Sequence, residues 1–146
     1  MTNEEFICYA YHAAEIKDIP GWVGCFTPDG TFTDDSLGVT YRGPNELGRT
    51  VEIYARAFPD MHRELYDVIV HGDVVIVELS LNGTHKGPLE LPKGTLPPSG
   101  KRMKAPCCDV FRLRNGKIQS SNCYPSGTVV LTQLGILQKL ESVFGK

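Results

Sequence analysis

Apolar residues in the first sixty positions recur with the spacing of helices. Between residues 4 and 19 they fall three or four positions apart, as on one face of an amphipathic helix. The residues on this stripe are Phe6, Tyr9, Ala10, Ala13 and Ile16. A short second helix is predicted from Trp22 to Phe26, and a third from Pro44 or Asn45 to about Ala57. Between them, residues 31–35 predict a short strand.

From residue 62 onward the pattern is typical of strands. One strand is predicted from His62 to His71, and a longer one from Val74 to Lys86 follows a Gly-Asp turn. The segment from Gly87 to Gly100 is rich in proline, glycine and leucine and is longer than most hairpin connections, which makes it a candidate lid. Gly127 to Phe144 predicts a final helix, with Gly135 as a point of interruption.

Residues 101–126 form the clearest hairpin of the chain. Asn115-Gly116 predicts a type I′ turn, because both residues accept positive φ angles. The register that follows places these pairs on one face: Leu113 and Ile118, Phe111 and Ser120, Asp109 and Asn122, Cys107 and Tyr124, Ala105 and Ser126. That face is apolar near the turn and polar further away. Because polar groups facing a core are costly unless they are paired, we expect the polar end to line a pocket.

The order of the elements predicts the fold class. Helices that precede a run of strands favour an α+β protein. We expect residues 1–146 to form a single domain. Its predicted shape is a cone, in which three or four helices wrap a curved antiparallel sheet of four to six strands around an internal pocket.

Composition narrows the class of function. A net charge of −2 gives no basic surface, so no nucleic acid partner is expected. No apolar run approaches the roughly 18 residues of a membrane helix, and no signal peptide is evident, so we expect a cytoplasmic protein that does not enter the membrane. The five cysteines show no CxxC spacing, which favours reduced thiols that fill space over a metal site or a disulfide framework. Cofactor-binding motifs are absent from the sequence, and no cofactor is expected.

Six short motifs occur in a characteristic order. They are Phe58-Pro59-Asp60, Gly72-Asp73-Val74-Val75, Gly83-Thr84-His85-Lys86-Gly87-Pro88, Asp109-Val110-Phe111-Arg112, Gly116-Lys117-Ile118 and Gln133-Leu134-Gly135. Together they resemble the SnoaL-like polyketide (ester) cyclase family of the nuclear-transport-factor-2-like (NTF2-like) superfamily. The resemblance covers nearly the whole chain and implies a deep apolar pocket and a homodimer. Such folds host isomerases, cyclases, epoxide hydrolases and non-catalytic binders, so the fold alone does not give the function.

One position departs from the pattern that this resemblance implies. The cyclases carry an aspartate seven residues before the glutamine of the Gln-Leu-Gly motif, where it serves as a general acid and base. Here that position is Ser126, and an aromatic residue four positions earlier is replaced by Asn122. Because a neutral hydroxyl cannot replace a carboxylate base, another group has to carry the chemistry, or the protein only binds its ligand.

Asp109 is the first candidate for that group. A carboxyl in an apolar pocket has a raised pKa, which suits a group that passes protons, although a structural carboxylate is an equal alternative. His85 is a possible partner, because it shares its strand face with an apolar row, although it also fits a role in fixing the strand end. Tyr124 or Asn122 would stabilise an enolate oxygen.

Other residues are candidates for the wall of the pocket. They are Trp22, Tyr41, Tyr54, Phe58, His62, Cys107 and Ser126. Asp34 and Asp35 lie near the expected pocket, but capping of a turn is the favoured role for that pair.

These residues predict a cofactor-independent lyase or isomerase of the polyketide cyclase type. It would bind an apolar, carbonyl-bearing ring compound and move a proton next to the carbonyl. Two alternatives stay open, a non-catalytic small-molecule binding module and an epoxide hydrolase that uses Asp109 with Asn122 and Tyr124.

Overall fold

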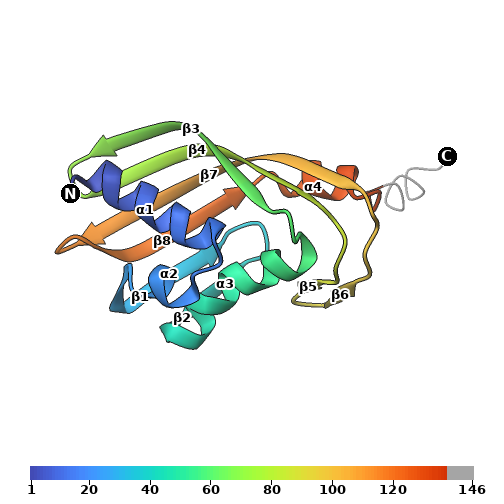
Figure 1. The fold of residues 1–146 in the computed structure, drawn as a ribbon, viewed down its shortest axis with the longest axis horizontal. Coiled ribbons are helices and arrows are strands. Elements are labelled where there is room, and N and C mark those ends of the chain that lie inside the picture. Colours follow the sequence, from blue (N-terminus) through green and yellow to red (C-terminus); the bar gives the residue numbers. More distant parts are fainter. Residues whose placement is uncertain (138–146) are drawn as a thin grey trace.

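Six strands form one curved sheet, and helices cover one of its faces (Figure 1). The computed structural model describes residues 1–137. The helices in that part of the chain are α1 (Asn3–Glu15), α2 (Ile19–Val23), α3 (Gly43–Ala57) and α4 (Gly127–Gln133). The strands are β1 (Phe26–Asp34), β2 (Val39–Arg42), β3 (His62–His71), β4 (Val74–Thr84), β5 (Leu89–Leu91), β6 (Gly94–Leu96), β7 (Arg102–Arg114) and β8 (Lys117–Pro125). This arrangement confirms the expected α+β class.

The strand order of the main sheet is β2-β1-β8-β7-β4-β3. All neighbouring pairs are antiparallel except β1 and β8, which run parallel, so the expectation of a purely antiparallel sheet was wrong at that pair. β1 and β8 can run parallel because a long connection through α3, β3, β4 and β7 lies between them. This connection brings β8 to the edge of β1 that β2 does not occupy. It brings the N-terminal strand β1 next to the C-terminal hairpin.

Helix α1 is held by a complete N-terminal cap and by a buried apolar face. Thr2 and Glu5 form a capping box, in which each side chain accepts a hydrogen bond from the other residue's backbone N–H. The buried face is Ile7, Ala10, Tyr11, Ala13 and Ala14. The predicted stripe was therefore rotated, since Tyr9 and Ile16 are exposed. The true stripe places a polar hydroxyl, that of Tyr11, inside the protein.

The β7–β8 hairpin contains a one-residue bulge. Leu113 pairs with Ile118 as predicted, but Arg112 pairs with Ser120, which leaves Gln119 as the extra residue. Beyond the bulge Asp109 faces Cys123, and Cys107 faces Pro125. Because side chains alternate along a strand, this single residue exchanges the two faces of the rest of β8.

The end of β4 is fixed by His85. Its backbone bonds to Lys101 and Gly100, and its Nδ1 accepts a hydrogen bond from the Ser99 backbone N–H at 3.2 Å. These contacts close the base of the segment from residue 86 to 100. That segment contains the small β5–β6 hairpin, which lies beside α3 in Figure 1. The histidine therefore fixes the strand end and the loop after it.

Helix α4 ends where the sequence predicted an interruption. Gly135 has a φ of +79°, a left-handed conformation that glycine adopts without strain. The rest of the helix predicted to reach Phe144 falls partly on residues 138–146, which lie outside the described residues. No helix in the described part of the chain is both long enough and apolar enough to span a membrane.

We predict that Gly87→Ala destabilises the fold. The backbone passes so close to the end of α3 that an added Cβ would lie 2.0 Å from the Arg56 carbonyl oxygen. Overpacking of this kind costs about 1–3 kcal/mol. Urea unfolding of the variant should show that loss. Gly127→Ala is the control, because its Cβ would meet nothing closer than 3.6 Å, and equal stability of the two variants would contradict the prediction.

Candidate active site

A cavity of about 210 Å³ lies between α3, β1, β5 and α4. Its wall is mostly apolar and contains four aromatic rings. The lining includes Phe32, Asp34, Tyr41, Thr50, Tyr54 and Phe58. Leu89 and Leu91 of the β5–β6 hairpin also line it, which places part of the predicted lid segment in the wall. Such a cavity suits a small apolar ligand with few polar groups.

Asp34 is the buried carboxylate of this cavity, with 4% of its surface exposed. Its Oδ1 accepts hydrogen bonds from the Ser36 backbone at 3.0 Å, the Ser36 hydroxyl at 2.7 Å and the Leu37 backbone at 3.3 Å. The predicted turn cap is therefore real, but it uses one oxygen only. Among residues 1–137, Oδ2 has no hydrogen bond or ion pair. One edge of the carboxylate remains available to a ligand.

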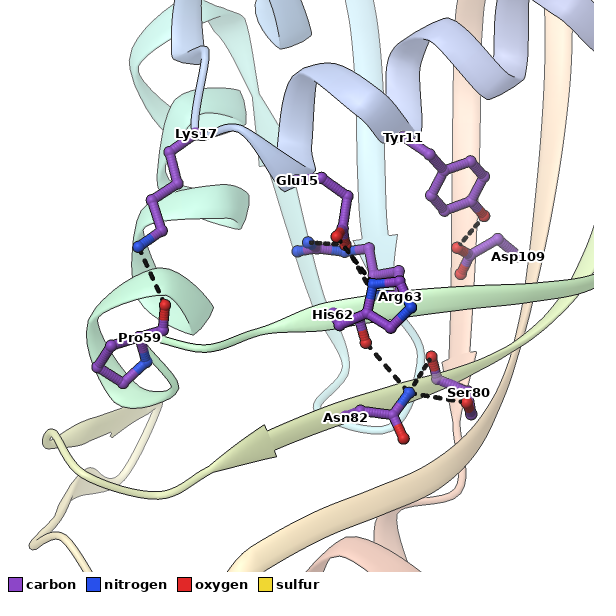
Figure 2. A network of polar contacts seen from close by, with 9 residues as sticks. All are labelled: Tyr11, Glu15, Lys17, Pro59, His62, Arg63, Ser80, Asn82 and Asp109. Carbon is purple, nitrogen blue, oxygen red and sulfur yellow. Dashed lines mark hydrogen bonds and ion pairs between the residues drawn. The ribbon is translucent and has the colours of Figure 1, made fainter.

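A smaller cavity of about 40 Å³ adjoins the first one. Phe32, Thr50 and Tyr54 line both cavities, so these three side chains form the boundary between them. The smaller one is lined by Asp109 from β7 and Tyr11 from α1. Figure 2 shows Tyr11 projecting from the helix toward Asp109, and the Tyr11 hydroxyl donates to Asp109 Oδ2 at 2.5 Å.

Burial governs the ionisation of this pair. Loss of hydration raises the pKa of Asp109, and the hydrogen bonds from Tyr11, Cys123 and Cys107 offset only part of that rise. Burial, together with the charge on Asp109, raises the pKa of Tyr11 well above its ordinary value. The interior therefore favours a neutral carboxyl beside a neutral phenol.

Two thiols complete the surroundings of Asp109. The Cys107 thiol donates to Asp109 Oδ1 at 3.5 Å, and the Sγ atoms of Cys107 and Cys123 are 3.6 Å apart. The sequence placed Cys107 on this face, and the bulge adds Cys123. The ligand atoms of all three residues lie within 4.8 Å of one another, so they form a group that could hold a metal ion.

The two carboxyl groups share one electrostatic environment. For Cys107 the hydrogen bond with Cys123 lowers the thiol pKa, but burial and the charges on Asp109 and Asp34 outweigh it and raise that pKa. Burial also raises the pKa of Tyr54 well above its ordinary value, and the charge on Asp34 adds to this rise. Asp34 and Asp109 therefore both act on Cys107, and each of them pairs in register with Cys123, Asp34 from β1 and Asp109 from β7.

The placement of Asn122 and Tyr124 on the inward face was wrong. The bulge at Gln119 turns both residues to the outer face of β8. Asn122 donates to Asp35 Oδ2 at 3.0 Å, and Tyr124 is 48% exposed. Neither side chain lies on the face that carries Asp109, so the arrangement required for the epoxide hydrolase alternative is not formed.

His85 lies on the inward face of its strand, as its parity predicted, but it is not among the residues that line either cavity. Its ring packs against Phe58 with centroids 5.4 Å apart. Burial lowers the pKa of His85, so the neutral ring that the Ser99 contacts require is favoured. The structure thus brings His85 to the back of the cavity wall and not to Asp109.

The aromatic candidates divide between the two cavities. Tyr41, Tyr54 and Phe58 line the larger one, whereas Trp22 lines the smaller one. The Trp22 indole N–H also donates to the Leu47 carbonyl at 3.1 Å and to the Thr50 hydroxyl at 3.0 Å, which ties α2 to α3.

Two further candidates lie away from both cavities. His62 is at an exposed strand start, where Figure 2 shows it beside Glu15, with His62 Nδ1 3.0 Å from Glu15 Oε2. Ser126 precedes α4, and only its neighbours Pro125 and Gly127 line the larger cavity.

Sequence reasoning missed Tyr11 and, for Asp34 and Asp35, favoured capping of a turn over a position in the pocket. The spacing of Ile7, Ala10, Tyr11 and Ala14 carried the signal for Tyr11, since this is also an apolar stripe of helical period. Asp34 could be placed on the inward face from the alternation of side chains along β1 only if the irregular stretch before Thr31 was already known.

Comparison with solved structures identifies the fold. A protein of ketosteroid isomerase-like fold from Catenulispora acidiphila, solved with trimethylamine, matches with a TM-score of 0.77 and 23% identity over 92% of this chain and 95% of its own. A proposed SnoaL-like polyketide cyclase from Jannaschia matches with a TM-score of 0.80 and 21% identity over 90% of each chain. A proposed polyketide cyclase from Streptomyces antibioticus matches with a TM-score of 0.76 and 22% identity over 92% of this chain and 99% of its own.

Sequence comparison gives the family. No curated protein matches the chain. The family model of the SnoaL-like domain matches residues 9–121, which span α1 to β8 and include both Tyr11 and Asp109. With this match over most of its length, the chain belongs to the SnoaL-like domain family.

Proposed function

We propose that this protein is a cofactor-independent isomerase or cyclase that moves a proton next to the carbonyl of an apolar ring compound. One observation carries the proposal: a buried phenol and carboxyl line one of two adjoining cavities, and a second buried carboxylate lines the other. This is the set of groups that enolisation needs, two hydrogen-bond donors for the oxygen and one base for the carbon.

The donors are Tyr11 and Asp109. In the free protein the phenol donates to the carboxyl, and a carbonyl oxygen entering the small cavity would take hydrogen bonds from both groups. A carboxylic acid kept neutral by an apolar site can stabilise an enolate oxygen in this way, beside a separate aspartate that serves as base. The raised pKa of Asp109 supports the role of donor over that of base.

The base is Asp34. Its Oδ2 would remove a proton from the carbon next to the carbonyl, while Oδ1 stays fixed by Ser36 and Leu37. Returning the proton to a different carbon completes an isomerisation. Attack of the enolate carbon on a second carbonyl of the same molecule completes a cyclisation. The carboxylate expected at Ser126 is unnecessary in either route, because Asp34 supplies one from the neighbouring strand β1.

The lining of the larger cavity indicates the kind of substrate. Among the described residues that line it, the charged side chains are Asp34 and Glu90, and both are acids. Glu90 is paired with Arg49 at 2.9 Å and with Arg56 at 3.0 Å, which offsets its charge. A wall of this composition favours an apolar and uncharged ring compound over a phosphorylated or carboxylated one.

We predict that Asp34→Asn loses most of the proton transfer. Exchange of the α protons of 2-tetralone, an apolar bicyclic ketone, in heavy water should be accelerated by the wild-type protein. The amide of the variant keeps the oxygen that caps the turn but cannot act as a base, so the rate should fall by about 10²–10⁴. Nuclear magnetic resonance measures the exchange.

Asp35→Asn is the matched control for that experiment, because Asp35 is the exposed neighbour on the outer side of the turn. Its rate should stay near that of the wild type. Equal loss in both variants would remove Asp34 from the mechanism. Tight binding of 2-tetralone without any exchange by the wild type would instead favour the non-catalytic binding module.

We also predict that Tyr11→Phe slows the exchange by about 10²–10³, because one of the two donors to the enolate oxygen is lost. The loss should be in kcat, since the apolar wall that binds the ring is unchanged. Tyr9→Phe on the exposed face of the same helix is the control. A Tyr11→Phe variant with the kcat of the wild type would contradict the assignment of the small cavity as the oxygen site.

A further inference from the structure

The side chains of Cys107, Asp109 and Cys123 form a buried cluster that the proposed reaction uses only in part. All three residues are less than 9% exposed. Asp109 and Cys123 face each other across β7 and β8, and Cys107 lies diagonally across from Cys123 on the same face. The cluster is therefore assembled by the sheet register and not by a local sequence motif. Spacing rules along the chain cannot detect it.

The distances within the cluster match those of a tetrahedral zinc site. With Zn–S bonds of about 2.3 Å and Zn–O bonds of about 2.0 Å, tetrahedral angles place two sulfurs about 3.8 Å apart and a sulfur and an oxygen about 3.5 Å apart. Here the two sulfurs are 3.6 Å apart, and Cys107 Sγ is 3.5 Å from Asp109 Oδ1. Two of the three ligand pairs therefore already stand at about the separations that a bound ion would impose, and the third pair lies within 4.8 Å.

A fourth coordination position is open to a small molecule. Asp109, Cys123 and Tyr11 line the cavity of about 40 Å³, which is large enough for one water molecule. Three protein ligands and one exchangeable position are the arrangement of open zinc sites.

Charge compensation is also present. Two thiolates and one carboxylate with Zn²⁺ would carry a net charge of −1. Arg63 lines the same cavity, and its positive charge already lowers the pKa of Asp109. The side chain of Arg63 is 12% exposed and is also paired with Glu15 at 3.7 Å, so its charge is shared between Glu15 and the cluster.

We propose that Cys107, Asp109 and Cys123 bind one Zn²⁺ ion, with a water molecule from the small cavity as the fourth ligand. Metal binding releases the protons that the thiols and the carboxyl carry in the free protein. It does not depend on the proposed reaction. The proposed reaction belongs to the metal-free form, and the zinc-bound form is inactive in it, because Asp109 bound to zinc has no proton to donate.

Cobalt(II) titration of the reduced, metal-free full chain tests this proposal. Tetrahedral Co²⁺ with thiolate ligands gives intense visible bands and sulfur-to-metal charge-transfer absorption. We expect one equivalent to bind and one equivalent of Zn²⁺ to displace it. Cys107→Ser and Cys123→Ser should each weaken binding at least tenfold. Cys8→Ser is the control, because Cys8 is exposed and distant from the cluster in the sequence, and it should bind as the wild type does.

X-ray absorption at the zinc edge of the wild-type protein provides a test that does not depend on how the variants fold. The expected shell has two sulfur and two oxygen ligands. A shell of nitrogen and oxygen only would overturn the proposal, as would absence of a stoichiometric cobalt band or a band unchanged in both cluster variants. Because these experiments contain no substrate, failure of the ketone exchange leaves their outcome unaffected.

Discussion

The hydrogen bond between Tyr11 and Asp109 is the constraint on which the rest of the site depends. A carboxyl group in an apolar interior is costly unless it has a partner, and α1 supplies that partner across 98 positions of sequence. The bond restrains how α1 lies over the sheet, because rotation of the helix would remove the hydroxyl partner of Asp109 Oδ2 and leave the buried Tyr11 hydroxyl without its acceptor. It also fixes the depth at which the small cavity ends. The capping box at Thr2 and the apolar face around Ala10 hold the helix in that orientation.

The contrast between the two aspartates follows from their neighbours. Asp109 is buried, and loss of hydration raises its pKa, whereas the hydrogen bonds from the Tyr11 phenol and the two thiols offset only part of that rise. Asp34 is held at one oxygen by two backbone N–H groups and one hydroxyl, while its second oxygen faces the larger cavity. Both aspartates pair in register with Cys123, Asp34 from β1 and Asp109 from β7, so the two residues lie in one row across the sheet.

Much of the fold could be predicted because local rules determine it. The Asn115-Gly116 turn fixed the start of the hairpin, and the alternation along β4 and β7 correctly placed His85 and Asp109 on the inward face. The third helix and β3 were also predicted to within a residue or two. These features depend on periods of two or of 3.6 residues, which are visible in the chain itself.

The site was harder to predict because it depends on exceptions to those periods. Gln119 adds one residue to β8, and nothing in the sequence marks it as a bulge, so Asn122 and Tyr124 were placed on the wrong face. Asp34 follows an irregular stretch of β1, which hides its parity. Tyr11 belongs to an apolar stripe that competes with a second, equally regular stripe on the same helix. Tertiary packing decides each of these cases.

The bulge at Gln119 has a consequence for how such a pocket can change through evolution. Each residue of β8 beyond the bulge belongs to one of two interleaved sets, and the bulge decides which set faces the interior. In this chain the inward set includes Ser121 and Cys123, while Asn122 and Tyr124 face outward. Loss of one codon at this point would exchange the two sets without altering any other residue. A single deletion could therefore convert a thiol-lined wall into one that carries an amide and a phenol. One strand thus contains the side chains for both kinds of wall.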